Sequence, residues 1–288
     1  MDSSVYLVQK KMGEIWHVYS DGTRADIPFD TDEDKVYAWN GIAISAIIAG
    51  VKVLVATVND THLHALVLGE DNRTERFRRV LKKRLSTHYS DIYLASDPVP
   101  TRDEALSKFM YVYRNCLDFY QKLPGEYPWG SGHIYFSEKK GCFRGHRIGN
   151  LSFREQQRLF KTRERLPAEW QYDADGRILP ECFIDYQFVE ELFRTVRAFI
   201  AFQYVRKEDE AAMKQEIHRR YLESRTIQDL RRLGNRHSKS YCGRSLVNAP
   251  LQIRLKIALR LLREGQSGRS PTLAKALYLN PDDLLLLV

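Results

Sequence analysis

The stretch VKVLVATVNDTHLHALVL, residues 51–68, decides the fold because it holds two strand-like segments with almost nothing between them. VKVLVATV (51–58) is rich in β-branched residues, and HLHALVL (62–68) continues the apolar pattern. The polar residues Asn59, Asp60 and Thr61 between them suit a tight turn. Two consecutive strands joined by so short a turn pair antiparallel.

Elements on both sides of this pair extend the same architecture. Strands are predicted at 14–20 and 91–96, and helices at 31–50, 73–88 and 101–121. Thr31 and Thr101 are the N-cap candidates, and Gly50 is a stop signal. The order strand, helix, strand, strand, helix, strand, helix favours an α+β fold over a doubly wound parallel sheet. We expect a ferredoxin-like antiparallel sheet flanked by helices in a first domain at residues 1–137.

The rest of the chain is predicted to be all-helical. Apolar residues recur at helical spacing in 152–163, 184–206, 208–223 and 250–264. We divide this part into a helical extension at 138–235 and a basic helical region at 236–288.

The formal net charge of +8 is concentrated near the C-terminus. Residues 231–288 contain eleven Lys and Arg against three Asp and Glu, whereas residues 1–230 are balanced. Short helices with this excess predict a helix-turn-helix-like DNA-binding region, in which Arg254 and Lys275 are candidate contacts. The alternative is that these helices form a structural cap and do not bind DNA, because Tyr278 stands where a Gly is expected in the turn.

A second basic run, RTERFRRVLKKR (73–84), directly follows the histidine-containing strand. Its residues Arg76, Arg79 and Lys83 share one helix face and could contact a DNA backbone. A solvated helix face is the alternative reading of such a run.

Two histidines interrupt the apolar strand at residues 62–68. Because side chains alternate along a strand, His62 and His64 point to the same face and can share a ligand. A lone histidine in such a strand is more often a core residue, so the pair needs a third partner. Tyr111 and Asn115 supply candidates, since residues four apart in a helix share a face. We interpret Tyr113 and Tyr120 as amphipathic core residues.

The chain resembles a known family, the HUH single-tyrosine transposases, and in particular their REP-associated branch. NDTHLHALV resembles the His-hydrophobic-His strand of that family, and YVYRNCLD resembles its nucleophile helix Tyr-Ile-His-Arg-Asn-Pro. YPWGSGHIYF (127–136) is similar to the Tyr-Pro-Trp-Ser-Ser segment that follows. The chain departs from the pattern at Cys116, which replaces Pro, and at Thr61, which replaces Asn.

The resemblance implies a role for each of these residues. His62, His64 and Asn115 would be metal ligands, and Tyr111 would attack single-stranded or hairpin DNA to give a 5′-phosphotyrosine. The family implies Mg²⁺ or Mn²⁺, whereas two imidazoles favour manganese, nickel or zinc. The alternatives are a domesticated DNA-binding protein without cleavage and a nickase of the replication-initiator or relaxase type.

Location and partners follow from the same observations. The longest apolar stretch (41–58) is interrupted by Gly50 and Lys52, which makes a poor membrane span. No secretory signal is evident at the N-terminus. The resemblance implies a prokaryotic, nucleoid-associated protein with DNA as its partner. We expect it to be cytoplasmic with no membrane contact, and we leave monomer and homodimer open.

Overall fold

The structure is a computed structural model that describes residues 14–20, 28–89, 92–118, 122–138, 145–203, 227–263, 271–280 and 282–283. The chain divides into two compact units, Met1–Arg206 and Lys207–Val288. This division differs from the boundaries expected after residues 137 and 235. The helix expected at 208–223 lies outside the described residues.

The first unit is built on a four-stranded sheet. Its strands are β1 (Ile15–Tyr19), β2 (Lys52–Val58), β3 (Leu63–Leu68) and β4 (Ala95–Pro98), in the spatial order β2-β3-β1-β4. All three neighbouring pairs are antiparallel. The predicted turn between β2 and β3 closes with a hydrogen bond from the Asn59 amide to the His62 carbonyl, 2.8 Å long.

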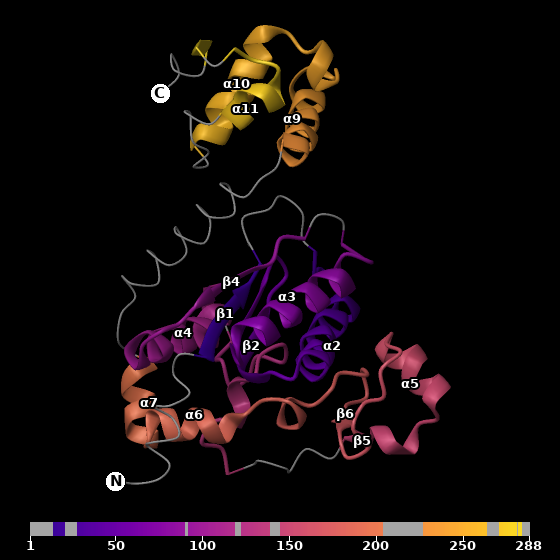
Figure 1. The fold of residues 1–288 in the computed structure, drawn as a ribbon, viewed down its shortest axis with the longest axis vertical. Coiled ribbons are helices and arrows are strands. Elements are labelled where there is room, and N and C mark those ends of the chain that lie inside the picture. The colour runs from indigo at the N-terminus through magenta and orange to yellow at the C-terminus, as the bar shows by residue number, and fades with distance from the viewer. Residues whose placement is uncertain are drawn as a thin grey trace. The chain divides into compact units, whose positions relative to one another are not determined.

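Three helices flank the sheet. Helices α2 (Asp32–Ala49) and α3 (Asp71–Leu85) pack against each other on one face, and α4 (Arg102–Arg114) packs against β2 and β3 on the other (Figure 1). These elements confirm the prediction of an α+β fold with an antiparallel sheet flanked by helices. The order along the chain is β1, α2, β2, β3, α3, β4, α4.

The predicted helix ends are set by local chemistry. Thr31 and Asp34 form a reciprocal capping box at the start of α2, and Gly50 ends it in the left-handed conformation with φ 70°. The Thr101 hydroxyl accepts the Glu104 amide at the start of α4. Helix α4 ends at Arg114 and continues as the 3-10 helix η2 (Asn115–Asp118), so it is shorter than the helix expected at 101–121.

Residues after 137 belong structurally to the first unit. They form β5 (His146–Arg147), α5 (Phe153–Phe160), β6 (Gln171–Tyr172), α6 (Tyr186–Phe193) and α7 (Val196–Gln203). Strands β5 and β6 pair antiparallel, so the prediction of an all-helical region is wrong for this segment. The Trp39 indole donates to the Ile178 carbonyl at 2.8 Å, which ties α2 to this segment. The helix expected at 184–206 is two helices, because Arg194 interrupts it with φ 67°.

The outer edge of β2 is also completed by later parts of the chain. Thr57 bridges Gly130 antiparallel, and Val53 bridges Ile184 in parallel. The Val58 amide donates to the Trp129 carbonyl at 2.9 Å. An edge strand that is covered in this way is less open to pairing with another chain.

The second unit contains α9 (Ile227–Cys242), η6 (Leu246–Asn248), α10 (Leu251–Arg263) and α11 (Pro271–Leu277). Leu230, Leu246, Ile257 and Leu273 are among the residues of its own buried core. The helical prediction for this region is confirmed. Tyr278, which follows α11, has φ 55°, the left-handed conformation that Gly adopts most readily. No helix in the described part of either unit is long and apolar enough to cross a membrane.

One half-buried histidine, His133, predicts how the first unit responds to acid. Burial, and secondarily the positive charge of Arg177, lowers the pKa of His133 to about 4 from its ordinary 6.5. The folded state therefore keeps His133 neutral, and the stability that this confers is present above pH 6.5 and lost as the pH falls toward 4. Between pH 7 and pH 5 the loss is about 2 kcal/mol.

The measurement is the free energy of urea unfolding at these two pH values. We expect His133→Gln to lose about 2 kcal/mol less on acidification than the native chain does. His146→Gln, at an exposed histidine, is the matched control and should lose as much as the native chain. Equal losses in His133→Gln and the native chain would contradict the prediction.

Candidate active site

The two histidines of the predicted pair lie together on the face of the sheet that α4 covers. His64 belongs to β3, and His62 is the residue just before the start of that strand. The exposed fraction is 2% for His64 and 5% for His62. Their rings meet edge to face with centroids 4.9 Å apart. The alternation that predicted a shared face is therefore observed.

Asn115 reaches this pair from the far end of α4. It is the first residue of η2 and is buried. Its Oδ1 lies 2.7 Å from His62 Nε2, while the other ring nitrogen of His62, Nδ1, lies 2.8 Å from Thr61 Oγ1. Both nitrogens of His62 are thus fixed by neighbours.

Tyr111 lies one helical turn before Asn115 and faces the same side. Its ring centroid is 5.2 Å from that of His64, at an interplanar angle of 75°. The structure therefore brings together all four residues that the sequence singled out for this site: His62, His64, Tyr111 and Asn115.

Tyr113, the other tyrosine of α4, points away from the histidines. Its position supports the selection of Tyr111 as the tyrosine of this site. It packs against Phe109, Tyr135 and Phe199, on the side of α4 that faces α7. Burial raises the pKa of Tyr113 to about 12, so its hydroxyl keeps its proton at neutral pH. The interpretation of Tyr113 as a core residue is confirmed, and Tyr120 lies outside the described residues.

His17 is a site residue that the sequence analysis missed. It lies in β1, fully buried, with Nε2 3.1 Å from Nδ1 of His64. Its ring stacks on Tyr19, whose hydroxyl donates to Asp97 at 3.0 Å. Burial, with Lys108 as a smaller cause, holds the pKa of His17 well below its ordinary value, so the imidazole is neutral and can accept a hydrogen bond.

Asn59 is the second residue that was missed in this role. It is fully buried in the turn before His62, and its Nδ2 donates to Asn115 Oδ1 in a very short hydrogen bond. The same Nδ2 lies 3.3 Å from His62 Nε2. The Asn59 Oδ1 atom is buried and has no hydrogen-bond partner among the residues that the structure describes.

The omission of His17 had a detectable signal. In the strand EIWHVYS, His17 and Tyr19 alternate in the same way as His62 and His64, which places two polar side chains on one face of a buried strand. The polar side chain of Asn59 fits the turn by itself, so no local pattern marks it as a site residue.

The donor set fits a divalent cation. Two imidazoles and an amide oxygen are ligands that first-row divalent ions accept. Ligands at right angles around an ion with bonds of ~2.1 Å lie ~3 Å apart, close to the 2.7 Å between His62 Nε2 and Asn115 Oδ1. His17 and Thr61 engage the remaining nitrogens, as outer-shell partners of metal-bound histidines do. Within the described ranges no three His, Cys, Asp or Glu residues form a metal cluster, so this set depends on Asn115.

The contact between His17 and His64 predicts an effect on metal affinity. We expect His17→Leu to weaken Mn²⁺ binding by about 10- to 100-fold, because His64 would lose the partner that fixes its ring and tautomer. Titration calorimetry with Mn²⁺ measures this directly. His17→Gln keeps a hydrogen-bonding group and should recover part of the affinity, and the exposed His146→Gln is the control. Unchanged affinity in His17→Leu would contradict the prediction.

The predicted cations of α3 are exposed but do not lie beside the histidines. Arg76, Arg79 and Lys83 line the solvent face of α3, which covers the opposite face of the sheet from α4 (Figure 1). Other cations of the same run have structural roles: Arg78 donates to Glu75, and Arg84 donates to the Phe160 carbonyl. Phosphate contacts from α3 would therefore involve DNA on a different face from the histidine pair.

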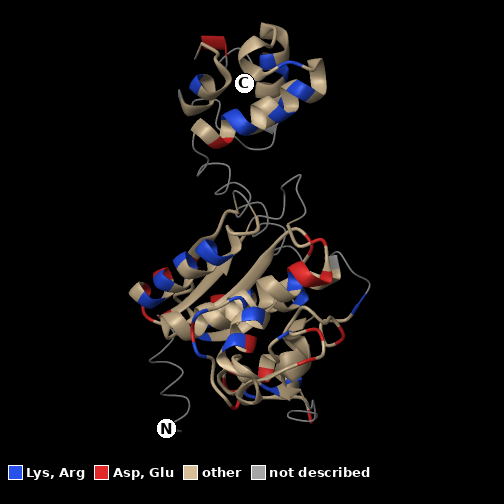
Figure 2. Cartoon of the chain, turned by 90° about the vertical axis from the view of Figure 1, so that its right-hand side faces the viewer, with Lys and Arg blue, Asp and Glu red and all other residues tan. Residues whose placement is uncertain are grey.

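The two candidate cations of the second unit differ in their surroundings. Lys275 is exposed on α11. Arg254 donates to the Tyr278 carbonyl just beyond α11, and the guanidinium of Arg231 lies 4.9 Å from the centroid of the Tyr278 ring. Figure 2 marks Lys and Arg along the helices of this unit as well as those of the first.

Comparisons with known proteins give one match. A solved structure described as a REP-associated tyrosine transposase bound to a REP hairpin is similar over 42% of this chain and 78% of its own, with 14% identity and a TM-score of 0.36. No protein-family model matches the chain. A search of curated proteins gives no match either.

Proposed function

We propose that the first unit is a metal-dependent tyrosine endonuclease and strand transferase for single-stranded or hairpin DNA, that is, a transposase of the HUH type. The observation that carries the proposal is the convergence of His62, His64, Asn115 and Tyr111 on one face of the sheet. The order β2-β3-β1-β4, with α2 and α3 as crossovers on one face, supports a ferredoxin-like assignment for this unit.

The reaction assigned to Tyr111 is a transfer of the phosphodiester to its hydroxyl. The Tyr111 oxygen loses its proton and bonds to phosphorus, the bond from phosphorus to the 3′ oxygen breaks, and that oxygen takes up a proton. The products are a 5′-phosphotyrosine and a free 3′-hydroxyl. Attack by another 3′-hydroxyl reverses the step and joins strands without an external source of energy.

Neighbouring residues would prepare the site for this step. A Mg²⁺ or Mn²⁺ ion held by His62, His64 and Asn115 would supply charge stabilisation at the phosphate. His17 and Thr61 would fix the orientations of the two imidazoles, and Asn59 would fix the Asn115 amide. Tyr111 is only 4% exposed, so its side chain is held in a site that is largely shielded from bulk water.

Two further surfaces would bind DNA outside the reaction centre. The exposed cations of α3 and the basic second unit are both suited to phosphate contacts. We assign to the second unit a helix-turn-helix-like accessory role, in which Lys275 is the exposed candidate on α11 and Arg254 supports the turn at Tyr278.

The test is covalent capture. The full chain is incubated with hairpin-containing single-stranded DNA and Mn²⁺, denatured, and analysed for protein that migrates with DNA. We expect an adduct that forms only with metal and maps by mass spectrometry to the peptide containing Tyr111. No adduct, together with DNA binding that EDTA leaves unchanged, would refute the proposal and favour a DNA-binding protein without cleavage. Nicking confined to a plasmid origin would favour the replication-initiator class.

A further inference from the structure

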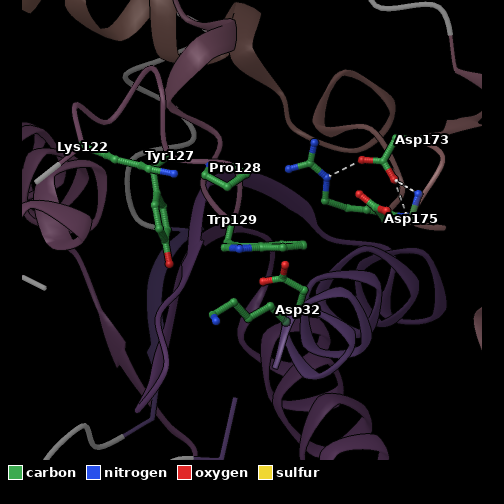
Figure 3. Close-up of a pocket in the computed structure, with 9 residues that line it drawn as sticks. Asp32, Lys122, Tyr127, Pro128, Trp129, Asp173 and Asp175 are labelled. Atoms are coloured by element: carbon green, nitrogen blue, oxygen red, sulfur yellow. Dashed lines mark hydrogen bonds and ion pairs between the residues drawn. The ribbon is translucent and has the colours of Figure 1, made fainter. Parts of the chain in front are cut away.

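A cavity of about 380 Å³ lies beside the turn that leads to His62, and the proposed reaction does not use it. Volumes of this order are found in small-ligand sites, which span ~300–1,000 Å³. The lining comes from the start of α2, from residues 122–129 and from residues 173–177. Figure 3 shows the Trp129 indole among the lining side chains, with Tyr127 and Lys122 on one side, Asp173 and Asp175 on the other, and Asp32 beneath.

Hydrogen bonds and an ion pair connect the cavity wall directly to the end of β2 and the turn that follows it. The Tyr127 hydroxyl donates to the Val58 carbonyl at 2.7 Å, and the Lys35 ammonium lies 2.8 Å from Asp60 Oδ1. The Trp129 carbonyl accepts a hydrogen bond from the Val58 amide. An occupant of the cavity would therefore be held next to the segment that positions His62.

The charges of the wall largely cancel. Arg177 donates to Asp173 at 2.8 Å while its guanidinium stacks 5.5 Å from the centroid of the Trp129 ring. Lys35 is paired with Asp60. A phosphate would gain little in a site whose cations and carboxylates balance, whereas a flat, uncharged ring with a polar edge suits an indole flanked by both.

We propose that this cavity binds one unpaired nucleobase of the DNA strand, stacked on Trp129 and hydrogen-bonded through an exocyclic amino group to the exposed carboxylates of Asp32 and Asp175. The inference rests on the proposed function for the identity of the strand as single-stranded DNA. Adenine, cytosine and guanine carry such an amino group and thymine does not, so the site discriminates against thymine. Stacking on the indole adds affinity that is independent of sequence.

The probe is an oligothymidylate of about 12 nucleotides with a single central 2-aminopurine, a fluorescent base that carries an amino group. The full chain is titrated in EDTA, which prevents cleavage. We expect 2-aminopurine fluorescence to be quenched on binding, because the base stacks. Because the carboxylates bind its amino group, we also expect this oligonucleotide to bind about five-fold or more tightly than one containing thymine alone.

Two pairs of variants locate the effect. Trp129→Leu should abolish the quenching and weaken the binding of both oligonucleotides, because each loses a stacked base, whereas Trp129→Phe should retain the quenching and the affinity. Asp175→Asn should reduce the preference for the amino-bearing base, and Glu164→Gln, at an exposed carboxylate outside the cavity, should leave it unchanged. If Trp129→Leu does not fold, Asp175→Asn decides the question, because its side chain is exposed.

The outcomes separate this inference from the proposed function. Native-like quenching in folded Trp129→Leu, or a native preference in Asp175→Asn, overturns the base site even if the covalent adduct forms. A lack of oligonucleotide binding by the native chain also overturns it. Quenching that depends on Trp129 and Asp175 supports the base site even if no adduct ever forms, in which case only the nuclease proposal fails.

Discussion

Tyr111→Phe is expected to form no covalent adduct with single-stranded DNA under conditions in which the native chain does. The substitution removes one oxygen atom and keeps the ring that packs against His64 and His17, so the fold and the DNA affinity should be retained. Loss of a covalent nucleophile can lower a rate by ~10⁶-fold, and we expect the rate of DNA cleavage to fall by at least ~10³-fold. Adduct yield against time on denaturing gels is the measurement.

Tyr113→Phe is the matched control for this variant. It removes the same atom two residues away, from a side chain that packs against Phe109 and Phe199 rather than against the histidines. Because the Tyr113 ring packs on the side of α4 that faces away from the histidines, its hydroxyl does not face a phosphate bound there, and the adduct should form at close to the native rate. An adduct that persists in Tyr111→Phe and disappears in Tyr113→Phe would reverse the assignment.

Gly132→Ala is expected to destabilise the first unit by about 3 kcal/mol or more. A Cβ at position 132 would lie 2.1 Å from the Pro124 carbonyl oxygen and 2.5 Å from its carbon, both of which are backbone atoms that a side-chain rotation cannot move. The clash would force apart the loop that carries Trp129 and the bridge from Gly130 to Thr57. For a unit of this size we expect the midpoint temperature of thermal unfolding to fall by about 6–12 °C.

Gly125→Ala tests whether the Gly132 effect is steric. The two glycines belong to the same loop, but an added Cβ at Gly125 meets no described atom within 4 Å. We expect the free energy of unfolding of that variant to lie within about 0.5 kcal/mol of that of the native chain. Thermal unfolding followed by calorimetry measures both variants. A Gly132→Ala variant as stable as Gly125→Ala would show that the loop can relax around the new methyl group.

Local patterns predicted the elements and much of the site. The β-branched runs on either side of the Asn59 turn, the Thr31 cap and the Gly50 stop each act within a few residues, so they can be read without tertiary information. The same holds for the shared face of His62 and His64, and for the spacing of Tyr111 and Asn115. These are consequences of strand and helix geometry.

Long-range packing decided the rest. His17 enters the site because β1 inserts between β3 and β4, which no local pattern around residue 17 indicates. The basic run of α3 follows the histidine strand in sequence, yet α3 packs on α2 and therefore covers the opposite face of the sheet. The segment after 137 joined the first unit through contacts such as Trp39 to Ile178.

The late completion of the β2 edge also has a consequence during synthesis. Ile184, which bridges Val53, is made about 130 residues after it, and ribosomes add roughly 5–20 residues per second. A nascent chain therefore exposes this apolar strand edge for on the order of ten seconds before its last partner emerges. A fragment that ends near residue 137 would keep the edge partly open permanently, and we expect it to aggregate unless a chaperone covers the strand.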